Sequence, residues 1–311
     1  MALQRIKLSG KYRLITRSDL DGVAAAALLQ DRGYIESILF THPKDIQDGT
    51  ISVGNRDILV NLPYMPGCAI AFDRSGAKLN ADAPNLVSDS AEGSVARLVY
   101  TWLGGRLSFP RIDQEMLNAV DKSVLANYTE TEVIDPQNWS LIAFLLDART
   151  GLGRFKDFRL SNYQLMHALI PLFRNLTVQD ILQNPDVAER VEIYREHQDR
   201  SIEQLRRCTQ VHGKVAVVDL RDEEVIWAGN RFLVYALFPQ IEVSIHAIWG
   251  LRRQNTVFAL GKSIINKESA VHLGNVAAQF NGGGHSGAGT CQVSHEKAAE
   301  TLTEILAQLH T

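Results

Sequence analysis

Apolar and polar positions along the first half of the chain predict strands that alternate with helices. Short runs rich in β-branched and other apolar residues predict strands at 12–16, 35–40, 58–62 and 68–72. The alanine-rich segment 23–31 predicts a helix, and a second helix is predicted to begin near Ser90, which would cap it. This alternation is typical of a parallel sheet with helices on both faces.

The pattern changes in the second half. Residues 112–182 are predicted to be mostly helical, and Asn184 with Pro185 then introduces a long charged helix that ends near Cys208. Further strands are predicted at 215–220, 243–249, 255–260 and 290–293, with helices at 269–280 and 296–309 and a glycine-rich loop at 281–285.

These elements predict an α/β protein in three parts. Residues 1–185 form an N-terminal parallel-sheet domain, 186–210 a linker helix, and 211–311 a smaller C-terminal α/β domain, with a cleft between the two domains. The net charge of -3 gives no indication of a basic nucleic-acid coat. The sequence contains no apolar run of the roughly 20 residues that a membrane span needs, and we expect no membrane partner. Three scattered cysteines favour the reducing cytoplasm over a disulfide framework.

Two carboxylates follow the first predicted strand. Asp19 and Asp21 stand one residue apart, and Asn61 and Asp73 follow two other predicted strands, whose carboxyl ends meet at one edge of a parallel sheet. Such a turn can hold a divalent cation through oxygen ligands. A helix cap is the alternative, and the spacing alone favours the cap.

A glycine-rich segment near the C-terminus contains a single histidine. Gly283 and Gly284 lie among three consecutive glycines, which let a backbone approach a ligand closely, and His285 can donate a hydrogen bond to a phosphate oxygen. A mobile turn would leave this histidine unexplained. Lys262 and Ser263 also suit an anionic group, although a solvated strand end explains them as well.

The order of these features resembles the DHH superfamily of phosphoesterases with its C-terminal DHH-associated domain. The superfamily includes RecJ-like exonucleases, NrnA-like oligoribonucleases, exopolyphosphatases and inorganic pyrophosphatases. Residues 17–22 resemble the first motif, His-x-Asp-x-Asp-Gly, and residues 282–289 resemble the Gly-Gly-Gly-His signature of the associated domain. Asp121 resembles the fourth-motif aspartate. The resemblance runs from residue 12 to about 293. Within the superfamily, the chain is similar to an exopolyphosphatase-like branch.

The middle motifs depart from the family pattern. Asn61 stands where the second motif has an aspartate, and Asp73-Arg74-Ser75 stands where Asp-His-His belongs. Arg17 replaces the histidine of the first motif. The branch shares Arg17 and Asn61 but keeps Asp-His-His, so Arg74 and Ser75 are this chain's own departure.

The resemblance implies two Mn²⁺ or Mg²⁺ ions that activate water against phosphorus. Arginine cannot ligate a metal, because it stays protonated and has no free lone pair. We therefore expect at most one ion, on Asp19, Asp21 and Asp121. Alternatively, the arginines form ion pairs with Asp73 and Asp121.

The first functional hypothesis is a protein that binds a phosphorylated ligand and has lost, or nearly lost, two-metal hydrolysis. The ligand would be a short single-stranded oligonucleotide, a cyclic dinucleotide or polyphosphate, bound in the interdomain cleft. Its candidate ligand-binding residues are Arg17, Arg74, Arg231, Lys262, Ser263, Gly283, Gly284 and His285.

The second hypothesis is an active phosphodiesterase or exopolyphosphatase that uses one Mn²⁺ or Mg²⁺ ion. Its candidate catalytic residues are Asp19, Asp21, Asp73 and Asp121. The third hypothesis is a non-catalytic scaffold protein. A homodimer is compatible with each of the three.

Overall fold

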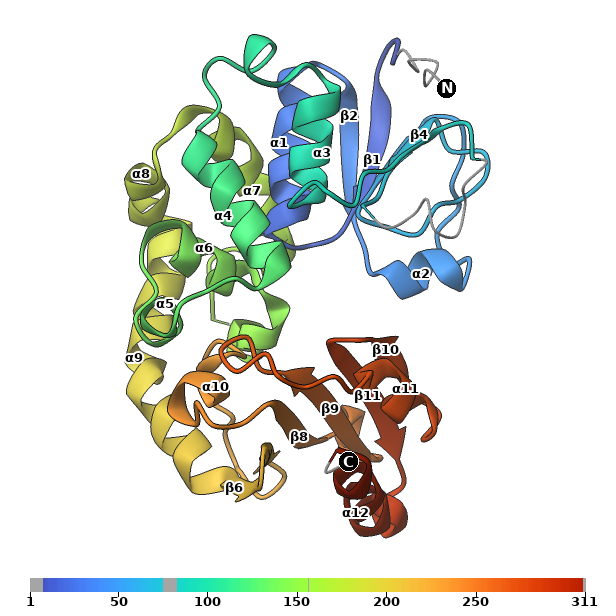
Figure 1. Ribbon diagram of the computed structural model, residues 1–311. Coiled ribbons are helices and arrows are strands. Elements are labelled where there is room, and N and C mark those ends of the chain that lie inside the picture. Colours follow the sequence, from blue (N-terminus) through green and yellow to red (C-terminus); the bar gives the residue numbers. More distant parts are fainter. Residues whose placement is uncertain (1–7, 75–82, 156, 310–311) are drawn as a thin grey trace. The chain divides into compact units, whose positions relative to one another are not determined.

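The chain consists of two compact units (Figure 1). The structure is a computed structural model that describes residues 8–74, 83–155 and 157–309. Unit 1 comprises residues 1–127, 137–148 and 152–192, and unit 2 comprises 128–136, 149–151 and 193–311. The division falls inside α9 (Pro185–Cys208), a single helix of 24 residues.

Unit 1 contains a parallel sheet of five strands in the order β2-β1-β3-β4-β5. The strands are β1 (Tyr12–Thr16), β2 (Ile35–Phe40), β3 (Asp57–Val60), β4 (Ile70–Phe72) and β5 (Leu86–Val87). The first two match their predicted bounds. Buried side chains on both faces explain why these strands read as continuous apolar runs in the sequence.

Helices cover both faces of this sheet, which confirms the predicted fold class. On one face, Ile46 of α2 (Pro43–Gln47) packs into a cluster with Ile15 and Leu59, which are paired neighbours on β1 and β3. On the other face, Phe72 of β4 meets Trp102 of α3 (Val95–Trp102) edge to face, with ring centroids 5.2 Å apart.

The central helix of unit 1 is α1 (Leu20–Asp31), which contacts α3, α4 and α7. Its residues 23–29 are all fully buried, so the alanine run is a core helix rather than an amphipathic one. The other helices of the unit are α4 (Gln114–Leu125), α6 (Asn138–Leu146), α7 (Asn162–Asn175) and α8 (Val178–Gln183).

Unit 2 contains a mixed sheet of six strands in the order β10-β11-β9-β8-β7-β6. The strands are β6 (Thr209–His212), β7 (Val215–Asp219), β8 (Val243–Trp249), β9 (Thr256–Lys262), β10 (Gly283–His285) and β11 (Ala288–Val293). Its helices are α5 (Glu130–Ile134), α10 (Leu233–Leu237), α11 (Leu273–Ala278) and α12 (Ala298–Leu309). Residues of α11 and α12 pack on the sheet in one hydrophobic cluster.

Several predicted elements differ from the described structure, and three of the differences concern caps or the type of element. The cap of α3 is Ser94 rather than Ser90, because the Ser94 hydroxyl accepts from the backbone N–H of Arg97 at 3.0 Å. The helix predicted at 269–280 is confined to α11, which His272 caps through Asn275. The glycine-rich segment is not a loop, since residues 283–285 form strand β10 against β11. Among the described residues, no helix is long and apolar enough to cross a membrane.

Candidate functional site

The carboxyl edge of the unit 1 sheet gathers several of the predicted site residues. Arg17 and Asp19 follow β1, Asn61 follows β3, and Asp73 and Arg74 follow β4. These strands are parallel neighbours, so their carboxyl ends lie side by side at one edge.

Asp19 caps helix α1. Its carboxylate accepts the backbone N–H of Gly22 at 2.9 Å, and it pairs with Arg17 through Nε at 3.2 Å. Both side chains are partly exposed, so this ion pair is weak. The capping alternative from the sequence is therefore observed, and the carboxylate stays accessible at the edge.

Asp21 lies one residue further on and is buried, with a 3% exposed fraction. Its two oxygens accept the backbone N–H groups of Val95 and Ala96, at 3.1 and 2.7 Å, at the start of α3. Burial, and then the charge of Asp19, raises the pKa of Asp21 to about 7. The carboxyl group is thus held by a helix N-terminus and is about half protonated near pH 7.

Asn61 adds a third donor to the same carboxylate. Its Nδ2 donates to Asp21 Oδ2 at 3.3 Å. Asn61 also adopts a left-handed backbone with φ of 55°, a conformation that asparagine tolerates better than most residues. The amide therefore serves as a hydrogen-bond donor to Asp21.

Asp121 of α4 lies near Asp21, but an arginine binds it. Arg97 donates to Asp121 Oδ2 from Nε at 2.9 Å and forms an ion pair with it, with Nη2 2.8 Å from Oδ2. The Ser94 hydroxyl donates to Oδ1 at 2.6 Å. Gly93 permits this close approach, since a Cβ there would lie 2.4 Å from Asp121 Cγ. Asp121 does form an ion pair, with Arg97 rather than with either arginine that the sequence analysis considered.

Arg97 was missed by the sequence analysis. Its partner lies 24 positions away on another helix, and this spacing carries no local signal. Only the packing of α3 against α4 brings the two side chains together.

Arg74 presents an unused donor at the sheet edge. Its Nε is buried and has no hydrogen-bond partner among the described residues, while its carbonyl accepts the Ser88 hydroxyl at 3.1 Å. Asp73 precedes it and donates its backbone N–H to Val87 at 3.2 Å. Ser75, the other departure from the family pattern, lies outside the described residues.

These residues do not fit a two-metal centre. A divalent cation needs oxygen or imidazole lone pairs, whereas the carboxylates of Asp19 and Asp73 share this edge with the N–H donors of Arg17 and Arg74. Within the described ranges, no three His, Cys, Asp or Glu side chains gather as metal ligands.

In unit 2 the glycine-rich segment forms a hairpin with β11. Gly284 has φ of 154°, and a Cβ there would lie 2.1 Å from the Ala288 carbonyl oxygen. A Cβ on Gly282 would lie 2.2 Å from the Thr290 carbonyl oxygen, whereas one on Gly283 would meet nothing within 4 Å. Packing thus requires glycine at positions 282 and 284, whereas a side chain at position 283 would extend into open space.

His285 is exposed at the end of β10. Its Nδ1 accepts the backbone N–H of Gly287 at 3.2 Å, so the neutral ring carries its proton on Nε2. Lys262 lies beside this turn, because its backbone N–H donates to the Gly287 carbonyl at 3.0 Å. In this tautomer Nε2 is the donor atom of the exposed His285 ring.

The other predicted residues of unit 2 have structural partners. Lys262 Nζ donates to the Ser269 carbonyl at 2.8 Å, and Ser263 Oγ accepts the backbone N–H of Asn266 at 2.9 Å. The Arg231 guanidinium lies over the Phe232 ring, 4.1 Å from its centroid. These contacts orient the side chains. The role of Lys262, Ser263 and Arg231 in ligand binding stays a prediction.

Solved structures similar to this chain identify its family. The pGpG-specific phosphodiesterase PggH from Vibrio cholerae is 45% identical, and the match covers 96% of this chain and 99% of PggH with a TM-score of 0.85. The chain belongs to the DHH phosphoesterase superfamily. This confirms the resemblance drawn from the first and last motifs.

More distant structures share the DHH fold. Exonuclease RecJ bound to manganese is 10% identical with a TM-score of 0.51, covering 99% of this chain and 92% of RecJ. CDC45 from Entamoeba histolytica is also 10% identical with a TM-score of 0.50, covering 99% and 97%. No protein-family model and no curated protein matches the sequence.

Proposed function

We propose that this DHH-family chain binds a short 5′-phosphorylated oligonucleotide of the pGpG type and does not hydrolyse it by two-metal catalysis. The ligand class is supported by the 45% identity to PggH, which is described as pGpG-specific. The proposed loss of hydrolysis is supported by the donor set at the sheet edge.

The observation that carries this proposal is that Arg97 and Ser94 already bind the Asp121 carboxylate. Each carboxylate oxygen already accepts a short hydrogen bond, one from the Ser94 hydroxyl and one from the Arg97 guanidinium. A cation at Asp121 would have to displace the Arg97 guanidinium from a partly buried ion pair. The free energy lost in breaking that pair exceeds what a site with few carboxylates would regain by binding the cation. Without a bound ion, nothing at this edge lowers the pKa of a water molecule.

The same edge suits a phosphate group. Arg17 has a side chain 42% exposed, and Arg74 offers a buried Nε–H that lacks a partner among the described residues. Guanidinium groups bind phosphate through two parallel hydrogen bonds, so they can replace metal ions as charge partners for an anion. His285 adds a neutral N–H donor in unit 2.

Binding and hydrolysis are measured separately to test this proposal. Calorimetric titration of the purified protein with pGpG in EDTA is expected to show binding, and chromatography after incubation with MnCl₂ is expected to show intact pGpG. His285→Ala should weaken binding about tenfold, in line with the loss of a hydrogen bond to a charged group. His212→Ala, at an exposed histidine on β6, is the matched control and should bind normally. Absence of binding in EDTA would overturn the proposal.

A second candidate is a metal-dependent phosphodiesterase. The identity to PggH favours it, since closely related chains of one superfamily often share their chemistry. One Mn²⁺ or Mg²⁺ ion would be held by Asp19, Asp21 and Asp121 and would activate water. In that case the unmodified protein would cleave pGpG with Mn²⁺, and Asp19→Asn would abolish the cleavage while leaving the fold intact.

A further inference from the structure

A histidine stands at the carboxyl edge of the unit 1 sheet, next to the first motif. His42 follows β2, which pairs in parallel with β1 and places Phe40 opposite Thr16. The pairing extends one residue further, because the Thr41 backbone N–H donates to the Thr16 carbonyl at 2.8 Å. Neighbouring strands are about 4.8 Å apart, so the backbones of Arg17 and His42 leave the sheet side by side.

The turn into α2 fixes the backbone that carries His42. Its N–H donates to Asp45 Oδ2 at 3.1 Å, and the Thr41 hydroxyl donates to the same oxygen at 2.9 Å. The hydrogen bond from Thr41, and then the one from His42, lowers the pKa of Asp45. Pro43 follows directly and begins the helix with a restricted φ. The backbone at His42 is therefore well defined.

The imidazole of His42 keeps one donor free. Its Nδ1 accepts the backbone N–H of Lys44 at 3.2 Å, so the neutral ring carries its proton on Nε2. The residue is exposed, and Nε2 has no partner in the part of the chain that the structure describes. His285 in unit 2 has the same arrangement, since its Nδ1 accepts a backbone N–H two residues ahead.

Arg17 supplies positive charge at the neighbouring strand end. Its Nε lies 3.2 Å from Asp19 Oδ2, and the guanidinium has no other ion-pair partner among the described residues. The side chain is partly exposed, so the Nη groups are accessible to a ligand. A guanidinium and an imidazole N–H on adjacent strand ends suit a phosphate group, because each of its non-bridging oxygens accepts hydrogen bonds.

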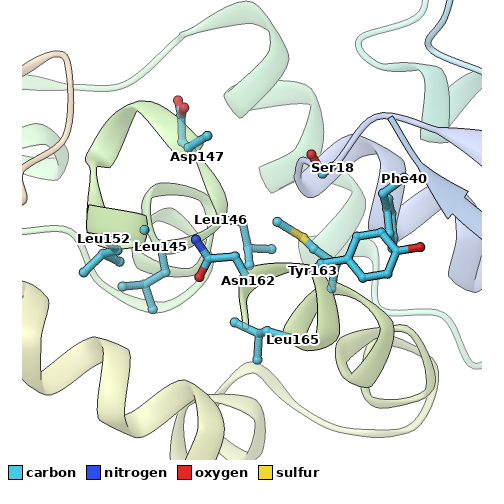
Figure 2. Close-up of a pocket in the computed structure, with 12 residues that line it drawn as sticks. Ser18, Phe40, Leu145, Leu146, Asp147, Leu152, Asn162, Tyr163 and Leu165 are labelled. Atoms are coloured by element: carbon cyan, nitrogen blue, oxygen red, sulfur yellow. The ribbon is translucent and has the colours of Figure 1, made fainter. Parts of the chain in front are cut away.

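A pocket of about 130 Å³ lies beside the ends of the same two strands (Figure 2). Ser18 and Phe40 form one side of it, and residues of α6, α7 and the turns between them complete the lining. Arg17 precedes Ser18, and His42 follows Phe40 by two residues, so both are chain neighbours of the pocket wall. Ligands bind preferentially at concave surfaces, and this edge provides one next to the two donors.

We propose that His42 is a further phosphate-binding residue, whose Nε2–H donates to an oxygen of the same phosphate group that Arg17 binds. The inference rests on the proposed function, because it assumes a ligand of the pGpG type at this edge. The alternative is that His42 serves only as the cap of α2, which needs Nδ1 but not Nε2. The two roles depend on different atoms of one ring, so substitutions can separate them.

The test compares two substitutions at this position by calorimetry with pGpG in EDTA. His42→Ser keeps an acceptor for the cap, because serine is among the preferred capping residues, but its side chain is too short to replace Nε2. His42→Ala removes both the cap and the donor. Each should weaken pGpG binding about tenfold, in line with the loss of a hydrogen bond to a charged group. Normal affinity of His42→Ser would show that the cap alone matters and would overturn the inference.

A second ligand identifies the phosphate that His42 contacts. GpG is the same dinucleotide without the terminal phosphate, so it retains only the phosphate between the nucleosides. If His42 binds the terminal phosphate, His42→Ser should change GpG binding less than about twofold while it weakens pGpG binding about tenfold. If His42 binds the other phosphate, both ligands should weaken to the same extent. Either result supports the inference.

Controls separate this inference from the function on which it rests. Thr177→Ala removes the cap of another short helix, α8, at an exposed residue, and should leave pGpG affinity unchanged. Thermal unfolding of each variant establishes that it is folded. If the unmodified protein does not bind pGpG, the proposed function fails and this inference fails with it. If the protein binds pGpG and His42→Ser binds it equally well, the proposed function stands and the role of His42 is overturned.

Discussion

The carboxyl edge of the unit 1 sheet and the β10–β11 hairpin of unit 2 have changed to very different extents relative to the DHH pattern. At the sheet edge, arginine or asparagine replaces metal-binding residues of the family motifs, and Arg97 with Ser94 occupies Asp121. The hairpin keeps its full Gly-Gly-Gly-His segment, and His285 keeps an N–H donor available.

This difference separates two tasks that one site usually combines. Metal ligation needs lone pairs, and at this edge the carboxylates of Asp19 and Asp73 stand among arginines that supply N–H donors and positive charge. Anion binding needs donors, and both regions supply them. Under the proposed function, the chain keeps the recognition of a phosphorylated ligand without two-metal hydrolysis.

Gly284→Ala is expected to have the largest effect on stability. The new Cβ would lie 2.1 Å from the Ala288 carbonyl oxygen, on a backbone whose φ of 154° favours glycine. We expect a loss of roughly 3–5 kcal/mol in the free energy of unfolding, measured by urea denaturation. Near-normal stability would mean that the hairpin does not need glycine at position 284. The hairpin would then no longer support the comparison of the two regions.

The pH dependence of stability tests the sheet edge. The pKa of Asp21 is about 7 in the folded protein, above its usual value of 3.8, because of burial and the charge of Asp19. The folded state therefore binds this proton more tightly than the unfolded state does. Its contribution is fully present below about pH 4 and is lost as the pH rises through 7, a change of roughly 4 kcal/mol.

Asp21→Asn removes this titration and serves as the reference for that measurement. Urea denaturation between pH 4 and 8 should show a decline in the unmodified protein that is absent from the variant. The comparison uses the slope of the free energy of unfolding against pH and not its absolute value. The side-chain amide of the variant has one acceptor oxygen fewer for Val95 or Ala96, which lowers the stability at every pH. Parallel pH profiles would contradict a raised pKa for Asp21 in the folded protein.

A double-mutant cycle on Arg97 and Asp121 measures the internal ion pair. Arg97→Ala should cost about 1–2 kcal/mol, because it leaves a partly buried carboxylate near Asp21 without its cation. The double variant Arg97→Ala with Asp121→Ala should cost less than the two single changes together. Additive effects in urea denaturation would mean that the pair does not neutralise Asp121 in solution.

Gly283→Ala is expected to have the smallest effect on stability and is the matched partner of Gly284→Ala. A Cβ at Gly283 meets nothing within 4 Å and needs no unusual φ, so stability should change by less than about 0.5 kcal/mol. Binding of pGpG should nevertheless weaken, because the methyl group stands where the ligand approaches the backbone. Unchanged binding in calorimetry would mean that the ligand does not contact the backbone at Gly283.

Much of the fold was predictable because its signals are local. The bounds of β1, β2 and β8 agree with the predicted runs, since a buried parallel or half-buried strand gives a clear apolar pattern. Ser90 and Ser94 are both suitable caps, and only the contact of Ser94 with Asp121 decides between them. The glycine run indicated a loop because sequence alone does not reveal that Gly282 and Gly284 are needed for close strand packing.

The candidate site was predictable in part for a similar reason. Asp19, Asn61 and Arg74 follow strands, and parallel topology brings them to one edge. The Arg97–Asp121 pair and the pocket between Phe40, Asp147 and Asn162 join distant segments, so they depend on tertiary packing that no local spacing encodes.

The most direct test of the account is chromatographic analysis of pGpG incubated with the purified, unmodified protein and Mn²⁺, alongside calorimetric binding in EDTA. The variant Arg74→His with Ser75→His, assayed in parallel, shows whether the replaced histidines account for the difference from the family. The account predicts binding without metal ions and no cleavage by the unmodified protein. Robust Mn²⁺-dependent cleavage of pGpG by the unmodified protein would contradict it.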